Sequence, residues 1–155
     1  MNDITSYMLE QTKKILSIDS PTGFTAHAAE YVLGAYKKLG YDAKLTNKGG
    51  IFVCVNDGPD QADDPADAPI LLEAHMDTLG GMVCSINEKG RLMLSALGGM
   101  NPNNAEAENC RVATRFSGTF EGTCQLSNAS VHVNGDYSDT KRSWDEMEIV
   151  LDEKA

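Results

Sequence analysis

One short stretch of the chain holds the residues whose types and spacing best suit catalysis. The segment PILLEAHMDTLGG, residues 69–81, is an apolar run that leads into His75 and Asp77 and then meets two glycines. If this run is a β-strand, Glu73, His75 and Asp77 point to one face, because strand residues alternate sides. An imidazole then lies between two carboxylates at a strand end, where open α/β sheets build their sites.

This arrangement suits a metal ligand. A ligating histidine commonly donates its other ring N–H to a carboxylate, which fixes the tautomer and raises the basicity of the ring. Asp77, two residues after His75, is placed to supply that carboxylate. The pattern His-x-Asp also arises by chance, so a histidine that completes a buried strand is the competing interpretation. His27 in a helical stretch and His132 in a strand-like stretch are weaker candidates.

The elements that must position this strand precede it in the chain. Apolar residues at helical spacing, and then at alternating spacing, predict two helices followed by strands. The predicted helices span 3–18 and 25–39, and the predicted strands span 42–46, 51–55 and 69–75. The break SPTGF separates the helices, and Thr22 within it is expected to bond nearby backbone groups. Residues 57–69 are rich in aspartate and proline and predict an exposed loop.

After residue 80 the pattern changes to short strand-like runs separated by turns. The runs are GMVCSI, RLMLSAL, CRVATRF, GTFEGTCQL, ASVHVN and EMEIVL. Short strands at close spacing are typical of a small β-barrel or sandwich. The sequence therefore predicts an α/β domain over residues 1–80, the start of a helix-covered mixed sheet, and an all-β barrel-like domain over 81–155.

Composition limits the classes of partner. The net charge is −10, so phosphate-rich nucleic acid and anionic membrane surfaces are not expected as partners. The chain has no apolar run of membrane-spanning length and no basic, then apolar, leader at its start, so a cytoplasmic protein is expected. The four cysteines form no C-x-x-C pair and are expected to be buried thiols.

Four pieces of the sequence together carry a family resemblance. These are SPTGFTAHAAEYV, the NKGG turn, PILLEAHMDTLGGMV and GRLMLSALGG, in that order. Their order and spacing resemble the N-terminal portion of the di-metal aminopeptidases known as tetrahedral, glutamyl and deblocking aminopeptidases, some of whose members were labelled endoglucanases. ENCRVATRF, GTCQLSNASVHVN and MEIVLDEK resemble one subgroup of that family, so the resemblance covers essentially the whole chain.

The resemblance implies a function and a site. It implies an α/β catalytic domain with two divalent ions, zinc or cobalt, and an inserted β-barrel domain that serves dimerisation and larger assembly. By position, His75 matches a metal ligand and Asp77 matches the catalytic aspartate that orients around it. The implied reaction is hydrolysis of the N-terminal residue of a short peptide by a metal-activated water, with a carboxylate as general base.

The chain departs from the family pattern because the other metal ligands and the general base lie downstream in full-length members. Both domains are therefore expected to be incomplete, and the isolated chain is expected to be inactive. The enzymatic interpretation is an aminopeptidase fragment. The alternatives are a non-catalytic assembly module that associates through its β domain, and an acidic domain that binds no metal.

Overall fold

The computed structural model describes residues 3–55 and 70–153, so the exposed loop predicted at 57–69 lies outside the described residues. The chain divides into two compact units, Met1–Thr78 and Leu79–Ala155. The division lies close to residue 80, where the sequence pattern changes from helices to short strands.

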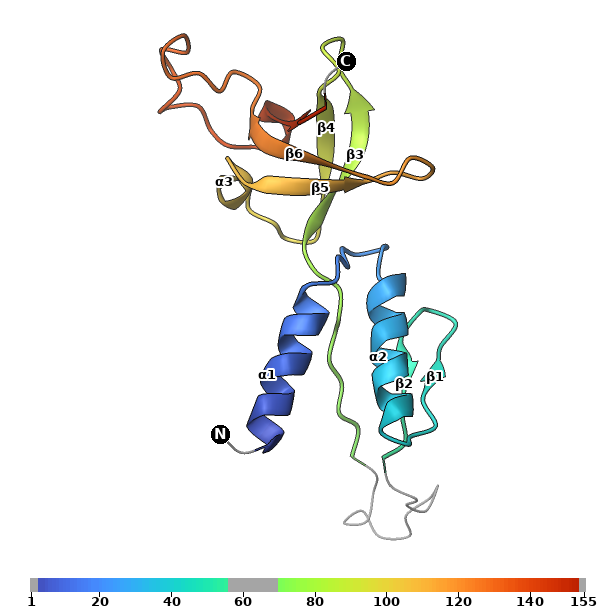
Figure 1. Ribbon diagram of the computed structural model, residues 1–155. Coiled ribbons are helices and arrows are strands. Elements are labelled where there is room, and N and C mark those ends of the chain that lie inside the picture. Colours follow the sequence, from blue (N-terminus) through green and yellow to red (C-terminus); the bar gives the residue numbers. More distant parts are fainter. Residues whose placement is uncertain (1–2, 56–69, 154–155) are drawn as a thin grey trace. The chain divides into compact units, whose positions relative to one another are not determined.

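Two antiparallel helices dominate the first unit (Figure 1). They are α1 (Asp3–Leu16) and α2 (Ala26–Lys38), as the apolar spacing predicts. α1 has an aspartate in its first turn and lysines in its last, which complements the helix dipole. α2 ends before Gly40, whose φ of 92° is the left-handed conformation typical of a residue that stops a helix. The Tyr31 hydroxyl donates to the Gln11 side-chain oxygen at 2.7 Å and joins the helices.

A short hairpin completes the regular structure of the first unit. β1 (Lys44–Leu45) pairs antiparallel with β2 (Ile51–Phe52), so both strands are shorter than the sequence predicts. The amide of Thr46 donates to the carbonyl of Gly50 at 2.7 Å across the turn. Among the described residues of this unit, only small side chains are buried: Ala28, Ala29, Ala43 and Ser20.

The strand predicted over residues 69–75 is wrong for the residues that the structure describes. Residues 70–77 are extended without a ladder, and only Thr78 forms a bridge, parallel to Pro21. Ile70, Leu71 and Leu72 are 87%, 76% and 92% exposed. The apolar run has the composition of a buried strand. A strand also needs a neighbouring strand whose backbone forms hydrogen bonds with it. Among the described residues of this segment, such pairing occurs only at Thr78.

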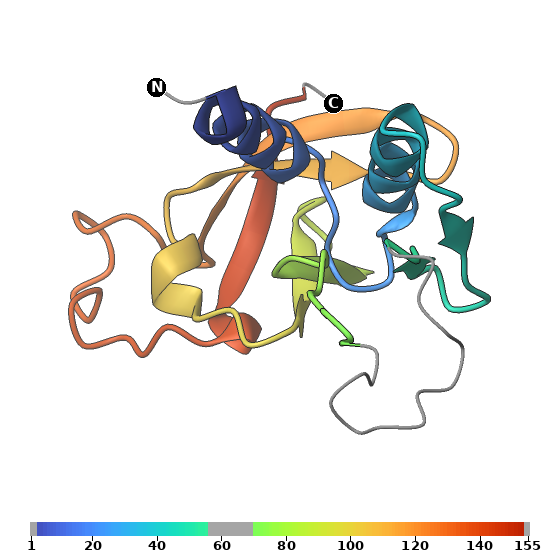
Figure 2. The ribbon, with the colours of Figure 1, turned by 90° about the horizontal axis from the view of Figure 1, so that it is seen from below.

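The second unit is a curled antiparallel sheet in the form of a half-barrel (Figures 1 and 2). Its strands are β3 (Gly80–Ile86), β4 (Leu92–Leu97), β5 (Asn109–Ala113), β6 (Thr119–Leu126) and β7 (Met147–Leu151). They are ordered β3-β4-β7-β6-β5, so the last strand of the chain lies at the centre. On the neighbouring strand β6, position 122 requires glycine, because a Cβ there would lie 2.5 Å from the Val150 carbonyl oxygen of β7.

The strand predicted at ASVHVN, residues 129–134, is also wrong. These residues form turns in which the amides of Val133 and Asn134 donate to the Ser130 carbonyl. The Asn134 side chain donates to the carbonyl of Asn128 at 2.9 Å. Asparagine side chains compete with strand ladders by such local bonds, and both valines of the run stay exposed.

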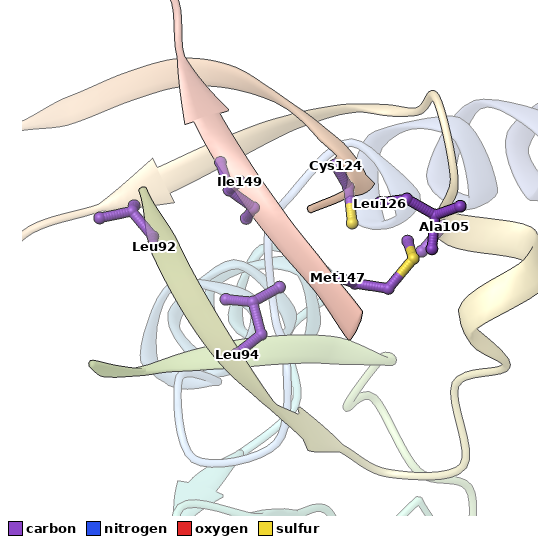
Figure 3. Close-up of a cluster of buried hydrophobic side chains, with 7 residues drawn as sticks. All are labelled: Leu92, Leu94, Ala105, Cys124, Leu126, Met147 and Ile149. Atoms are coloured by element: carbon purple, nitrogen blue, oxygen red, sulfur yellow. The ribbon is translucent and has the colours of Figure 1, made fainter. Parts of the chain in front are cut away.

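The core of the second unit gathers side chains from three central strands and a short helix, α3 (Pro102–Ala105). The buried set is Leu92 and Leu94 on β4, Cys124 and Leu126 on β6, Met147 and Ile149 on β7, and Ala105 on α3 (Figure 3). Burial raises the pKa of the Cys124 thiol to about 11. The prediction of buried thiols fails for Cys54 and Cys84, which are exposed.

A half-buried ion pair fastens the long segment before β7 to the end of α3. Glu106 accepts from Nε of Arg142 at 2.7 Å and from its Nη2 at 3.1 Å. The Tyr137 hydroxyl donates to the same carboxylate at 2.9 Å, and the Arg142 guanidinium lies over the Tyr137 ring. These donors, the Arg142 hydrogen bonds first, hold the pKa of Glu106 below its ordinary value.

Leu126→Ala is expected to lower the free energy of unfolding of the second unit by about 2–5 kcal/mol, because Leu126 is 1% exposed and its removal leaves a cavity. The measurement is urea unfolding followed by circular dichroism. Phe116→Ala is the control, since Phe116 is 87% exposed and its loss should change stability by no more than about 0.5 kcal/mol. Equal effects of the two substitutions would contradict this assignment of the core.

The Glu106 ion pair is expected to make stability pH-dependent. Its folded pKa lies below the ordinary 4.5, so the stabilisation is complete above that value and is lost as pH falls through the folded pKa. The difference in unfolding free energy between the native chain and Glu106→Gln should therefore shrink as pH falls from neutral to about 3. Other carboxylates are common to both proteins and cancel. A difference that stays constant with pH would contradict the ion pair.

Candidate metal site

His75 and Asp77 lie in the extended segment of the first unit, not at a strand end, and the structure brings them together. Nδ1 of His75 lies 3.0 Å from the backbone carbonyl oxygen of Asp77 and 3.2 Å from its carboxylate Oδ1. Two acceptors at one nitrogen place the ring proton on Nδ1, because neither oxygen can donate. The His75 side chain is 86% exposed, so its Nε2 lone pair is accessible.

A turn between the helices lies against this pair. Pro21–Phe24 is closed by the Phe24 amide, which donates to the Pro21 carbonyl at 2.7 Å. Gly23 has a φ of 87°, which the third position of a type II turn requires and glycine adopts without strain. The sequence therefore sets Thr22 at the corner of a defined turn.

Four hydrogen bonds join this turn to the extended segment. The Ser20 hydroxyl donates to the Met76 carbonyl at 2.7 Å, and the Thr22 hydroxyl donates to Asp77 Oδ2 at 2.7 Å. The Thr78 amide donates to the Ser20 carbonyl at 2.8 Å, and the Thr22 amide donates to the Thr78 carbonyl at 3.3 Å. We call residues 20–22 with 76–78 the clip.

The charge on Asp77 is favoured by its surroundings. The hydrogen bond from Thr22 is the largest cause that lowers the pKa of Asp77, and its own backbone amide and His75 lower it further. Burial opposes them with an effect smaller than that of Thr22. Asp77 is therefore a carboxylate at neutral pH. Each oxygen of this carboxylate has its own partner: Oδ2 accepts from Thr22, and Oδ1 lies beside Nδ1 of His75.

The residues present fit one ligand of a metal centre. A neutral imidazole whose Nδ1–H faces a carboxylate and a carbonyl is the usual arrangement of a ligating histidine that binds through Nε2. Glu73, which was expected on the same face as His75 and Asp77, does not complete a set of metal ligands with them. Within residues 3–55 and 70–153, no three histidine, cysteine, aspartate or glutamate side chains group as metal ligands do.

The other histidines lie elsewhere. His27 is on an exposed face of α2, with its ring edge-on to Phe24 at 5.9 Å between centroids. His132 is exposed in a turn of the second unit. Sequence reasoning missed Ser20 and assigned Thr22 to local bonds, although its partner lies 55 residues away. The sequence signal for these two residues was the run SPTGF, which predicts a turn but does not indicate which distant residues the turn contacts.

The chain thus holds a unit with a histidine–aspartate pair near its end, followed in sequence by an antiparallel half-barrel. The family model of M42 glutamyl aminopeptidases matches residues 50–155. The chain belongs to this peptidase family.

Individual relatives agree. A Bacillus subtilis protein named as a candidate aminopeptidase, YhfE, is 34% identical over 145 residues, which are 94% of this chain and 40% of the relative. The glutamyl aminopeptidase of Lactococcus lactis is 31% identical over 109 residues, 70% of this chain and 29% of the relative. The chain therefore spans less than half the length of the relatives it matches.

A solved structure supports the fold. The TET1 peptidase of Pyrococcus horikoshii matches with a TM-score of 0.74 at 22% identity, over 94% of this chain and 40% of that one. That protein is described as assembling into a tetrahedron or a large octahedral shell. Among the described residues of this chain, no helix has the length and apolar character needed to cross a membrane.

Proposed function

We propose that this chain contributes to a metal-dependent aminopeptidase that removes N-terminal residues from short peptides. The observation that carries the proposal is the His75–Asp77 pair, whose ring geometry leaves Nε2 available as a ligand. Membership of the M42 family supports it, since the named relatives are aminopeptidases.

The chain's own residues have separate roles in this proposal. His75 would hold a zinc or cobalt ion through Nε2, and Asp77 would keep the Nδ1 proton in place and oppose the charge that builds on the ring. A divalent ion, when bound, supplies a Lewis acid that activates water and polarises the scissile carbonyl. A two-ion centre needs several more ligands and a general base, and the described residues group no such set around His75.

The 155 residues alone are therefore expected to show no aminopeptidase turnover on aminoacyl reporter substrates, with or without added zinc or cobalt. Turnover that needs both metal and His75 would contradict this expectation. The informative host is the Bacillus subtilis relative YhfE, whose match covers 94% of this chain, with its matched segment exchanged for the corresponding residues of this chain. This chimera should be active with metal.

Within the chimera, Asp77→Ala should lower kcat/KM by about 10- to 100-fold, and His75→Ala should lower it further. His132→Ala is the matched control, because that histidine is exposed in a turn of the other unit. A folded chimera whose activity is the same with His75→Ala as without it would refute the assigned ligand.

We also propose that the chain self-associates through its second unit. Its sheet ends in β3 and β5, whose outer edges have no ladder partner among the described residues. β3 carries no charged residue, and all its side chains are exposed. Such an edge is a template for pairing with another chain. The shell assembly of the Pyrococcus structure supports this proposal.

Light scattering is expected to give a mass of at least twice the 16.7 kDa of the chain. Met82→Lys, on the exposed edge strand β3, should lower that mass because pairing would bury an ammonium group. Phe116→Lys, also an exposed apolar residue but in the turn after β5, is the control. The mass of a single chain at every concentration would contradict self-association.

A further inference from the structure

Thr22 is connected to His75 through a continuous chain of contacts. Its hydroxyl donates to Asp77 Oδ2 at 2.7 Å, and the other oxygen of that carboxylate, Oδ1, lies 3.2 Å from His75 Nδ1. A carboxylate that is bonded at one oxygen loses the freedom to rotate its other oxygen away. We infer that Thr22 is a positioning residue, which holds Asp77 so that His75 keeps its proton on Nδ1 and presents Nε2 to a metal ion.

The exposure of the pair is the reason that this bond matters. His75 is 86% exposed and Asp77 is 41% exposed at the side chain, so water competes for the histidine–aspartate contact. An exposed ion pair or hydrogen bond of this kind is weak, so by itself it holds the two side chains together only loosely. A third group that fixes the carboxylate reduces the entropy lost when the ring settles against it, which is the effect of preorganisation.

The backbone of the clip holds Thr22 where this role requires it. The Thr22 amide donates to the Thr78 carbonyl, and the buried Ser20 hydroxyl donates to the Met76 carbonyl at 2.7 Å. These bonds fix the residues on both sides of Asp77 relative to the turn. Gly23 closes the same turn with a φ of 87°, a backbone conformation that residues with a side chain rarely adopt. Hydrogen bonds between residues 20–22 and residues 76–78 therefore hold Thr22 beside Asp77, so that its hydroxyl reaches the carboxylate.

The inference rests on the proposed function, because it assumes that Nε2 of His75 is the ligand atom. The ring geometry itself can be tested without metal or substrate. Long-range ¹H–¹⁵N correlation spectra distinguish the two neutral tautomers of histidine. They are recorded on the full chain near pH 8, above the ordinary imidazole pKa of about 6.5. The three histidines are assigned by single His→Gln variants.

The native chain is expected to show His75 protonated at Nδ1, although an isolated imidazole side chain prefers the proton on Nε2. Thr22→Val keeps the shape and removes the hydroxyl, so the Nε2-protonated fraction of His75 should rise, while the backbone carbonyl of Asp77, 3.0 Å from Nδ1, remains as the other acceptor. Thr22→Ser keeps the hydroxyl and should retain the native spectrum. Asp77→Ala should reproduce the effect of Thr22→Val, and its backbone spectrum reports whether the fold persists.

An unchanged His75 tautomer in a folded Thr22→Val protein would overturn the inference. So would a change that Thr22→Ser also shows. In the chimeric enzyme, Thr22→Val should weaken zinc binding by about 10-fold or more, the usual effect of losing a group that orients a ligand.

Failure of the inference and failure of the proposed function give different results. If the tautomer shifts as expected but the chimera neither binds zinc nor turns over, the proposed function fails and the positioning role stands. If the chimera is active and depends on His75 while Thr22→Val leaves the tautomer unaltered, the positioning role fails and the proposed function stands.

Discussion

The hydrogen bonds of the clip are the constraint on which the candidate site depends. Residues 70–77 have no ladder of their own, so their path is set where Ser20 and Thr22 bond to them. Ser20 is one of the few buried residues in the part of the first unit that the structure describes. The same contacts that hold the segment in place also orient the carboxylate of Asp77. Structure and candidate chemistry are thus coupled through one turn of the chain.

Two kinds of element could be predicted from the sequence: helices, which satisfy their backbone hydrogen bonds internally, and strands that pair with the next strand along the chain. α1 and α2 satisfy their backbone internally, and their predicted ends differ from the observed ends by at most two residues. β3 pairs with β4 through a short turn, and β5 pairs with β6 likewise. Alternation of apolar residues is sufficient for such hairpins because the partner is adjacent in sequence.

Elements that depend on distant partners could not be predicted in the same way. The apolar run before His75 has the composition of a buried strand, yet it is extended and exposed among the described residues. ASVHVN alternates like a strand, but the bonds of Asn134 and Ser130 turn it back on itself. The pairing of His75 with Asp77 is predictable because their spacing is local, whereas the contact between Thr22 and Asp77 spans 55 residues.

Burial of the extended segment and completion of the site have one physical requirement in common. Ile70, Leu71 and Leu72 expose apolar surface that a sheet neighbour would cover. Any parallel strand that paired with this segment would bring its own carboxyl end beside His75, because the carboxyl ends of parallel strands meet at one edge of the sheet. Side chains following such a strand are the natural source of further ligands. The clip already pairs Pro21 parallel with Thr78, three residues after His75, so parallel pairing begins beside the candidate site.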